Sequence, residues 1–333
     1  MTPEAAMRSA IEQAERVKGT TYPNPPVGAV ILDPDGDVVG AGGTQPAGGS
    51  HAEIEALQAA GERARGGTAF VTLEPCNHHG RTPPCVDALL AAGVSAVSYA
   101  VADPNPVAAG GARRLAEGGV AVSVGLLADE VRQGPLREWL HKQRTGLPHV
   151  TWKFASSVDG RSAAADGSSQ WITGTAARAD VHRTRAVADA IVVGTGTVFA
   201  DDPTLTARHA DGTLTDRQPL RVVVGMRDVS ADAQVLNDDS RTMLIRTHDP
   251  HEVLRALADR TDVLLEGGPT LAGAFLRAGL VDRILAYVAP MLLGGPITAV
   301  DDVGVSSIGQ ARRWQYDGVT AIGPDLRLSL VPA

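Results

Sequence analysis

The sequence contains very little cysteine, with two residues in a chain of 333. Two cysteines cannot form the disulfide framework that stabilises many small secreted proteins. The fold must therefore depend on hydrophobic cores, and a hydrophobic content of 44% is ordinary for a globular protein. Unoxidised thiols are typical of a reducing compartment, so we expect a cytoplasmic protein.

Three further features are missing from the sequence. No apolar run approaches the roughly 20 residues that cross a membrane. Residues 1–5 do not combine a basic region with an apolar core, so we expect no signal peptide. The formal net charge of −8 argues against a nucleic-acid partner, because such a surface needs a basic field. We therefore expect neither a membrane nor a nucleic acid as partner.

A length of 333 residues suggests two domains, each large enough for its own core. Buried-strand patterns alternate with helical patterns along both halves, which indicates an α/β protein. A charged, mostly helical segment ends at Thr145-Gly146-Leu147-Pro148, and we place the domain boundary there. The predicted domains are residues 1–147 and 148–333.

Both cysteines lie in one stretch, in which His51-Ala52-Glu53 is followed by Pro75-Cys76 and by Cys85. Two thiolates and an imidazole suit Zn²⁺ with one open position, the arrangement of catalytic zinc. Because positions i and i+2 do not share a helix face, we interpret Glu53 as the proton-transferring group and not as a ligand. A His-x-Glu followed by a Pro-Cys…Cys pair matches the signature of zinc deaminases.

Two helices are predicted to begin at this stretch. Ser50 and Glu53 have the spacing of a capping box, which predicts a helix start near His51. Thr82-Pro83-Pro84 predicts a second helix start with proline in its first turn. Two positive helix N-termini would then converge on the metal and favour ionised sulfur.

The second half contains two glycine-rich turns that each follow a predicted strand, Gly194-Thr195-Gly196-Thr197 and Glu266-Gly267-Gly268-Pro269-Thr270. Such turns either approach a phosphate or simply connect a strand to a helix, and neither is a Gly-x-Gly-x-x-Gly fingerprint. The polar segment 168–174 is either a packed loop or a loop that faces a ligand. Arg185 and Arg208 either bind a phosphate or are solvated.

Taken together, these motifs resemble the bifunctional deaminase/reductase family of riboflavin biosynthesis over essentially the whole chain. The first half matches through the motifs Pro23-Asn24-Pro25, His51-Ala52-Glu53, Glu74-Pro75-Cys76, Gly80 to Cys85 and Asp103 to Pro106. The second half matches through Lys153, Asp159-Gly160-Arg161, Ser169 to Thr173, Asp201-Asp202-Pro203, Glu266 to Thr270 and Leu293-Gly294-Gly295.

The resemblance implies an N-terminal cytidine-deaminase-like three-layer domain and a C-terminal dihydrofolate-reductase-like domain. It implies zinc-dependent hydrolytic deamination of a phosphoribosylamino-pyrimidine, followed by NADPH-dependent reduction of its ribose to a ribityl chain. The implied cofactors are one Zn²⁺ per chain and NADPH. The implied partner is a small phosphorylated pyrimidine, and the family leaves room for a homo-oligomer, either a dimer or a tetramer.

Site residues follow from the resemblance by motif. In the first half it implies that His51, Cys76 and Cys85 bind zinc, that Glu53 is catalytic, and that Asn24, His78 and Arg81 contact the deaminase substrate. In the second half the implied substrate contacts are Lys153, Ser169, Arg185, Leu205, Arg208 and Glu266. The implied NADPH contacts are Ala155, Trp171, Thr197, Asp201, Gly268, Pro269 and Thr270.

The sequence departs from the family at three places. Thr44 stands where a histidine is usual, which removes one deaminase substrate contact. Gly225-Met226 replaces a common Asp-Ser and changes one cofactor contact. The segment Gly134 to Trp139 replaces the usual Leu-Asn…Phe before the linker, so the packing between the domains is expected to differ.

Two alternative functions fit parts of the pattern. A nucleic-acid base deaminase shares the His-x-Glu and cysteine signature, but it usually carries a Cys-x-x-Cys, and the acidic charge and second domain argue against it. A non-catalytic, zinc-stabilised binding module would need a fourth protein ligand, for which His78 and His79 are the candidates.

Overall fold

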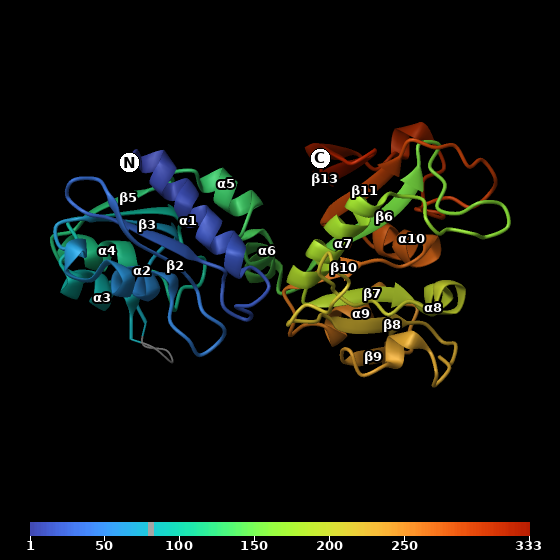
Figure 1. The fold of residues 1–333 in the computed structure, drawn as a ribbon, viewed down its shortest axis with the longest axis horizontal. Coiled ribbons are helices and arrows are strands. Elements are labelled where there is room, and N and C mark those ends of the chain that lie inside the picture. The colour runs from blue at the N-terminus through green and yellow to red at the C-terminus, as the bar shows by residue number, and fades with distance from the viewer. Residues whose placement is uncertain (79–82) are drawn as a thin grey trace. The chain divides into compact units, whose positions relative to one another are not determined.

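The computed structural model describes residues 1–78 and 83–333. The chain divides into two compact units, Met1–Gly146 and Leu147–Ala333, each with its own sheet and core (Figure 1). In the described part of the chain no helix has both the length and the apolar character needed to cross a membrane.

The first unit contains a five-stranded sheet in the order β2-β1-β3-β4-β5. Strands β1, β2 and β3 pair antiparallel, whereas β3, β4 and β5 are parallel. The strands are β1 (Gly28–Leu32), β2 (Val38–Gly43), β3 (Thr68–Leu73), β4 (Ala96–Val101) and β5 (Ala121–Val124). The helices are α1 (Pro3–Val17), α2 (Ala52–Ala60), the short 3₁₀ helix Gly61–Ala64, α3 (Cys85–Ala92), α4 (Gly111–Glu117), α5 (Ala128–Gln133) and α6 (Arg137–Thr145).

Helices cover both faces of this sheet, and glycines in the strands allow the closest approaches. A Cβ on Gly28 would lie 1.9 Å from the carbonyl oxygen of Ala10 in α1. On the next strand, a Cβ on Gly42 would lie 2.9 Å from the backbone nitrogen of Ala56 in α2, while Gly43 faces α1. Since neighbouring strand residues point to opposite faces, α1 and α2 lie on opposite sides of the sheet. The unit is therefore the three-layer domain that the sequence predicted.

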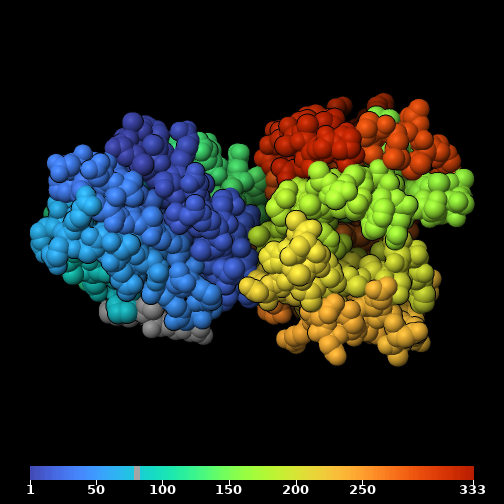
Figure 2. All heavy atoms as spheres, in the orientation of Figure 1, coloured from blue at the N-terminus to red at the C-terminus, as the bar shows by residue number. Residues whose placement is uncertain are grey.

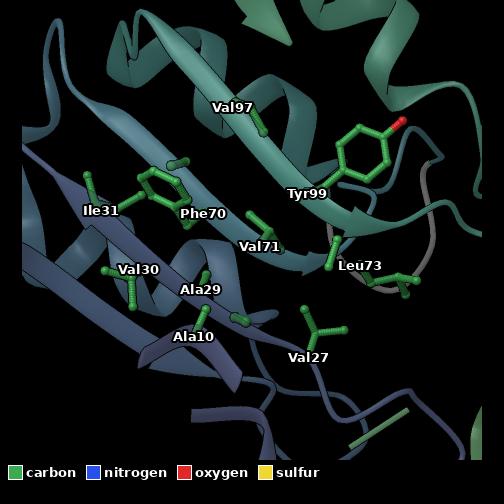
Figure 3. Close-up of a cluster of buried hydrophobic side chains, with 14 of the residues drawn as sticks. Ala10, Val27, Ala29, Val30, Ile31, Phe70, Val71, Leu73, Val97 and Tyr99 are labelled. Atoms are coloured by element: carbon green, nitrogen blue, oxygen red, sulfur yellow. The ribbon is translucent and has the colours of Figure 1, made fainter. Parts of the chain in front are cut away.

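Buried aliphatic and aromatic side chains fill the space between the sheet and these helices. Figure 3 shows side chains of β1, β3 and β4 together with Ala10 of α1, and Phe70 and Val71 point from neighbouring positions of β3. All five residues of β1 are buried, which explains why the strand reads as an unbroken apolar run in the sequence. This central packing fixes the carboxyl end of β3, from which the chain continues to Cys76.

The second unit contains an eight-stranded sheet in the order β12-β13-β11-β6-β10-β7-β8-β9. Strands from β11 to β9 are parallel, and β13 and β12 extend the sheet antiparallel. The strands are β6 (His149–Ser157), β7 (Ala190–Gly194), β8 (Leu220–Val224), β9 (Thr242–Ile245), β10 (Asp262–Leu265), β11 (Arg283–Ala289), β12 (Trp314–Ile322) and β13 (Asp325–Pro332). The helices are α7 (Thr175–Val187), α8 (Thr195–Asp201), α9 (Pro250–Ala256) and α10 (Pro269–Arg277), with short 3₁₀ helices at Gln234–Leu236 and Ile308–Gln310.

Side chains alternate between two cores along the central strands of this sheet. Val192 belongs to one core cluster, and its neighbours Ile191 and Val193 belong to another on the opposite face. A strand buried on both faces needs apolar residues at every position, as β7 has. Strands β10, β7 and β8 are parallel neighbours. Because they run in the same direction, their carboxyl ends lie at one edge of the sheet.

The predicted caps of two helices are wrong in detail. Helix α2 begins at Ala52 with His51 as its N-cap, and no side chain caps it, so Ser50 and Glu53 form no capping box. Ser50 stands one residue too early for a cap. Helix α3 begins at Cys85 with Pro84 as its N-cap, so the prolines precede the first turn instead of forming it. Both helices still start at the stretch that contains the predicted zinc ligands.

Several elements of the second unit escaped the sequence analysis. Strands β9, β12 and β13 are only partly buried, so they lack the continuous apolar run that marks the central strands. Helix α9 did have a signal, because Asp249 caps it and Pro250 is its first residue. The turn Gly194 to Thr197 also continues into a helix, α8.

Candidate active sites

The three predicted zinc ligands converge in the first unit. His51 Nδ1 lies 3.3 Å from Cys85 Sγ and 3.5 Å from Cys76 Sγ. The ligand atoms of all three lie within 4.8 Å of one another. Tetrahedral zinc, with Zn–N and Zn–S bonds of about 2.1 and 2.3 Å, separates a nitrogen from a sulfur by about 3.5 Å. The donor set and its spacing therefore fit zinc.

Two helix N-termini converge on this site, as the sequence predicted. His51 is the N-cap of α2, and Cys85 is the first residue of α3. The backbone N–H of Cys85 donates to Cys76 Sγ at 3.4 Å. An amide donor and the positive end of a helix both favour ionised sulfur.

The two thiols hold their protons very unequally. The hydrogen bond from Cys85 lowers the pKa of Cys76 to about 4, and His51 acts in the same direction. The same pairing raises the pKa of Cys85. The hydrogen bond with Cys76 raises the pKa of His51. Cys76 is thus an ionised sulfur, and a metal would displace the remaining thiol proton of Cys85.

Glu53 lies beside these sulfurs and is only 4% exposed. Burial raises the pKa of its carboxyl to about 7, and the charge of Cys76 adds to the rise. A carboxyl that titrates near neutral pH can both accept and donate a proton. It lies outside the ligand group that His51, Cys76 and Cys85 form.

A second carboxylate, Glu74, holds the cysteine loop in place. It is buried immediately after β3 and accepts backbone N–H groups of Asp103 at 3.2 Å and of Gly110 and Ala112 at 3.1 Å. These bonds tie the segment before Cys76 to the loop that follows β4. In the sequence, Glu74 is part of the Glu74-Pro75-Cys76 motif, which by itself indicates no role for the glutamate. The signal that could have identified it is an acidic residue at the end of an apolar strand.

The predicted deaminase substrate contacts differ in their burial and hydrogen bonding. Asn24 is half-buried, and its backbone exchanges hydrogen bonds with Thr21. The Nδ1 atom of His78 is buried, and no described residue is hydrogen-bonded to it. Such an atom suits a ligand. Arg81 lies outside the described residues. Thr44, the departure from the family, is buried and hydrogen-bonded to Val27, so it faces the protein interior.

The alternative of a closed structural zinc site requires a fourth protein ligand. Among the described residues, the ligand group at this place consists of His51, Cys76 and Cys85, and His78 is not part of it. His79, the other candidate, lies outside the described residues.

In the second unit, three of the predicted substrate residues form one charge cluster. Arg185 of α7 donates to both carboxylate oxygens of Glu266, from Nε at 2.7 Å and from Nη2 at 2.9 Å. Lys153 Nζ of β6 lies 3.6 Å from the same carboxylate. These cations lower the pKa of Glu266 to about 2, although its burial opposes them. Nε and Nη2 of Arg185 are thus engaged by Glu266, an arrangement that neither of the two sequence-based alternatives, phosphate binding or solvation, included.

A short segment, Thr204 to Arg208, lies next to this cluster. The carbonyl of Thr206 accepts from Arg185 Nη1 at 3.1 Å, and its hydroxyl accepts from Arg208 Nε at 3.1 Å. Leu205 is buried with a backbone φ of 52°, a left-handed conformation that is unfavourable for leucine. Figure 2 shows the part of the chain around this segment, in yellow, on the surface of the second unit. Five of the predicted substrate contacts therefore lie close together. Ion pairs join Lys153 and Arg185 to Glu266, Thr206 links Arg185 to Arg208, and Leu205 precedes Thr206 in the chain.

Predicted NADPH contacts meet at the carboxyl ends of β7 and β10. The backbone N–H of Gly268, the N-cap of α10, donates to Thr197 Oγ1 at 3.2 Å. Pro269 is the first residue of that helix, and Thr270 Oγ1 donates to Asp301 at 2.7 Å. A helix N-terminus without bulky side chains fits a dinucleotide phosphate.

The remaining predicted contacts lie on the segments nearby. Trp171 is 66% exposed, and Arg178 lies 4.6 Å from its ring centroid. An exposed aromatic face suits a flat cofactor ring. Ser169 Oγ donates to Asp201 at 3.5 Å, and Ala155 is on β6 beside Tyr287. Gly225, the second departure from the family, packs against the side chain of Thr195, while Met226 is exposed.

Comparison with known proteins shows which family shares this arrangement. Residues 148–328 match the RibD C-terminal domain, and residues 1–101 match the cytidine and deoxycytidylate deaminase zinc-binding region. The riboflavin biosynthesis protein RibD of Mycobacterium tuberculosis is 70% identical over 98% of this chain and 97% of its own length. The chain belongs to the RibD family. It is a bifunctional enzyme of riboflavin biosynthesis with deaminase and reductase activities, and it uses zinc and NADPH.

Other relatives extend the similarity across the whole chain. RibD of Escherichia coli is 41% identical over the full length of both chains. A solved structure from Thermotoga maritima, described as a diaminohydroxyphosphoribosylaminopyrimidine deaminase/5-amino-6-(5-phosphoribosylamino)uracil reductase, is 31% identical. It superposes with a TM-score of 0.91 over 99% of this chain and 98% of its own. The second unit accordingly has the dihydrofolate-reductase-like fold of RibD reductases.

Proposed function

We propose that the two activities are divided between the two domains and act in succession on one phosphorylated pyrimidine. Residues 1–147 would replace an amino group of a phosphoribosylamino-pyrimidine by oxygen, with water consumed and ammonia released. Residues 148–333 would then transfer hydride from NADPH to the ribose and open it to a ribityl chain. The relative from Thermotoga maritima, whose name states both reactions, supports this substrate.

The observation that carries the first half is the convergence of His51 Nδ1 and two sulfurs beside a buried carboxyl. His51, Cys76 and Cys85 would hold zinc, which supplies Lewis-acid activation of water when bound. Glu53 would take a proton from the water and deliver it to the departing nitrogen. Its burial keeps the carboxyl from bulk solvent during both transfers.

Further residues would bind the pyrimidine in the first domain. Asn24 lies before β1, and His78 follows the first cysteine. Each would offer hydrogen bonds to the ring or its substituents, and Arg81 would meet an anionic group. The unpartnered Nδ1 of His78 supports this assignment most directly.

In the second domain, the residues of the charge cluster would hold the substrate. Lys153, Arg185 and Glu266 are fixed by their mutual ion pairs, and Leu205 and Arg208 are fixed through Thr206. Ser169 would complete the set. Because hydride transfer depends on positioning, a rigid cluster of this kind favours the reaction.

The NADPH-binding residues would be those at the carboxyl ends of β7 and β10. The turn Gly268-Pro269-Thr270 would take the pyrophosphate at the N-terminus of α10, and Thr197 would support it from α8. Trp171 would stack on a ring of the cofactor, with Ala155 and Asp201 as further contacts.

Two broader properties belong to the same proposal. A site that needs reduced Cys76 and Cys85 favours a reducing compartment, so we place the protein in the cytoplasm. A homo-oligomer, either a dimer or a tetramer, would be consistent with the family. Sedimentation of the purified protein would measure its mass. A monomer at all concentrations would contradict the proposed homo-oligomer.

A coupled assay tests the whole proposal. The purified protein is given the phosphoribosylamino-pyrimidine, and ammonia release and NADPH oxidation are followed separately. Ammonia should appear without NADPH, whereas NADPH oxidation should require either the deaminated compound or prior deamination. Oxidation of NADPH by the amino substrate in a zinc-depleted enzyme would overturn the proposed order.

A further inference from the structure

The charge cluster of the second unit contains more buried positive charge than its carboxylate balances. The side chains of Lys153 and Arg185 are 17% and 16% exposed, and both pair with the single carboxylate of Glu266. Burying a cation without an equal opposite charge is unfavourable. The cluster is therefore suited to an additional anion, such as a phosphate of the substrate.

A histidine that the sequence analysis gave no role lies beside this cluster. His182 is on α7, three residues before Arg185, so the two side chains share a face of the helix. The carbonyl of Thr206, which accepts from Arg185, also acts on the ring of His182 and raises its pKa. The Nδ1 atom of the ring is buried, and no described residue is hydrogen-bonded to it.

We propose that His182 is a further substrate-binding residue of the reductase, which contacts the substrate phosphate through Nδ1 and takes up a proton on binding. This inference rests on the proposed function of the second domain. The observation that points to a ligand is the buried Nδ1 atom, to which no described residue is hydrogen-bonded. A neutral ring whose Nδ1 is the acceptor can donate from that atom to a phosphate oxygen only when the ring becomes protonated.

The surrounding charges explain why protonation would accompany binding. In the free protein, burial and the charges of Arg185 and Arg208 lower the pKa of His182, while Thr206 and Glu266 oppose them. The ring is therefore neutral near pH 7. A phosphate brings a charge of about −1.5 to −2, which favours the protonated ring. Phosphate affinity should consequently fall as the pH rises from the pKa of the free ring to the higher pKa of the ring in the complex, and level off above it.

The experiment measures proton uptake by calorimetry. Ribose 5-phosphate is titrated into the full-length protein near pH 7.5, in two buffers that differ in ionisation enthalpy. The wild-type protein should take up about one proton per bound ligand. Ribose without the phosphate should bind more weakly and without uptake, which separates phosphate recognition from sugar recognition.

His182→Gln keeps an amide that can bond to Thr206 but cannot be protonated. It should bind ribose 5-phosphate roughly tenfold to a hundredfold more weakly, because a charge-assisted hydrogen bond is lost. The proton uptake on binding to this variant should fall to the part that comes from protonation of the ligand's own phosphate. His251→Gln, at an exposed position in the first turn of α9, is the matched control and should behave as the wild-type protein.

Two results would overturn the inference: wild-type binding without proton uptake, or unchanged affinity and uptake in a folded His182→Gln protein. If that variant does not fold, the wild-type calorimetry still decides, together with an NMR titration of the histidine rings with and without ligand. Failure of the reductase assignment is distinguishable. In that case the wild-type protein would bind ribose 5-phosphate with His182-dependent uptake and yet would not oxidise NADPH with the deaminated substrate.

Discussion

At the scale of single residues, the chain shows how burial sets the chemistry of carboxyl groups. Glu53 and Glu266 are both enclosed by protein, yet their acidities move apart. Burial raises the pKa of Glu53 to about 7 and a nearby thiolate adds to the rise, whereas two cations outweigh the burial of Glu266 and its pKa falls to about 2. The first group can exchange a proton at neutral pH, and the second stays charged and holds its partners.

Glu53→Gln tests the role of the first group. Glutamine keeps the size of the side chain but cannot accept a proton, so zinc should remain bound while deamination slows by about 10²–10⁴-fold. Metal content and the rate of ammonia release are measured on the same preparation. A variant that retains zinc and runs at the wild-type rate would show that Glu53 moves no proton.

Glu266→Gln tests the second group through stability. Because its pKa is depressed to about 2, the carboxylate stabilises the fold above its ordinary pKa of 4.5, and this contribution is lost as the pH falls through about 2. The variant should therefore melt at a lower temperature than the wild-type protein at pH 7. The gap should narrow between about pH 5 and pH 2. A gap that is independent of pH would mean that the destabilisation is not electrostatic.

At the scale of elements, the sequence was most informative where a strand is buried on both faces. The five buried residues of β1 and the apolar residues of β7 form short continuous apolar runs, which are typical of such strands. The residues that converge as His51, Cys76 and Cys85 could be picked out together because residue type and order define the motif. The occupied fork of Arg185 and the role of Glu74 could not be found, since both depend on contacts between segments far apart in sequence. The strands β9 and β12 lie at the two edges of the sheet. They are only partly buried there, so their sequences lack the continuous apolar run of a central strand.

Gly28→Ala tests the close packing of α1 on β1. The added Cβ would lie 1.9 Å from the carbonyl oxygen of Ala10, a backbone atom that can move only with the helix. We expect a loss of about 1–3 kcal/mol in the free energy of unfolding, measured by denaturant titration. Gly318→Ala in β12 is the control, because a Cβ there meets no atom within 4 Å. Equal stability of the two variants would contradict the packing described for α1.

At the scale of the whole molecule, the residues proposed for the two activities form separate sets. The group His51, Cys76 and Cys85 lies in the first unit, and every proposed NADPH contact lies in the second. The residues proposed for metal binding and those proposed for hydride transfer therefore do not overlap. The family match divides the chain at nearly the same place, since the RibD C-terminal domain begins at residue 148.

Paired variants test this independence. Cys76→Ser should abolish deamination and leave NADPH oxidation with the deaminated substrate nearly unchanged, because the reductase needs no metal. Arg208→Ala should do the reverse, since it removes a contact near the substrate. Both rates and the melting temperature are measured for each variant. Loss of reductase activity in a folded Cys76→Ser protein would show that the zinc site supports the second active site.

The order of strands in the second sheet has a consequence for synthesis on the ribosome. Strand β6 is the first of this unit to emerge, yet its neighbours in the sheet are β10 and β11, which end at Leu265 and Ala289. The apolar strand β6 therefore stays unpaired in the nascent chain while more than a hundred further residues are translated. The deaminase domain can complete its sheet at Val124, before β6 has been made. Proteolysis of stalled nascent chains should accordingly find residues 1–146 protected early, and protection of β6 should appear only after β11 has left the exit tunnel.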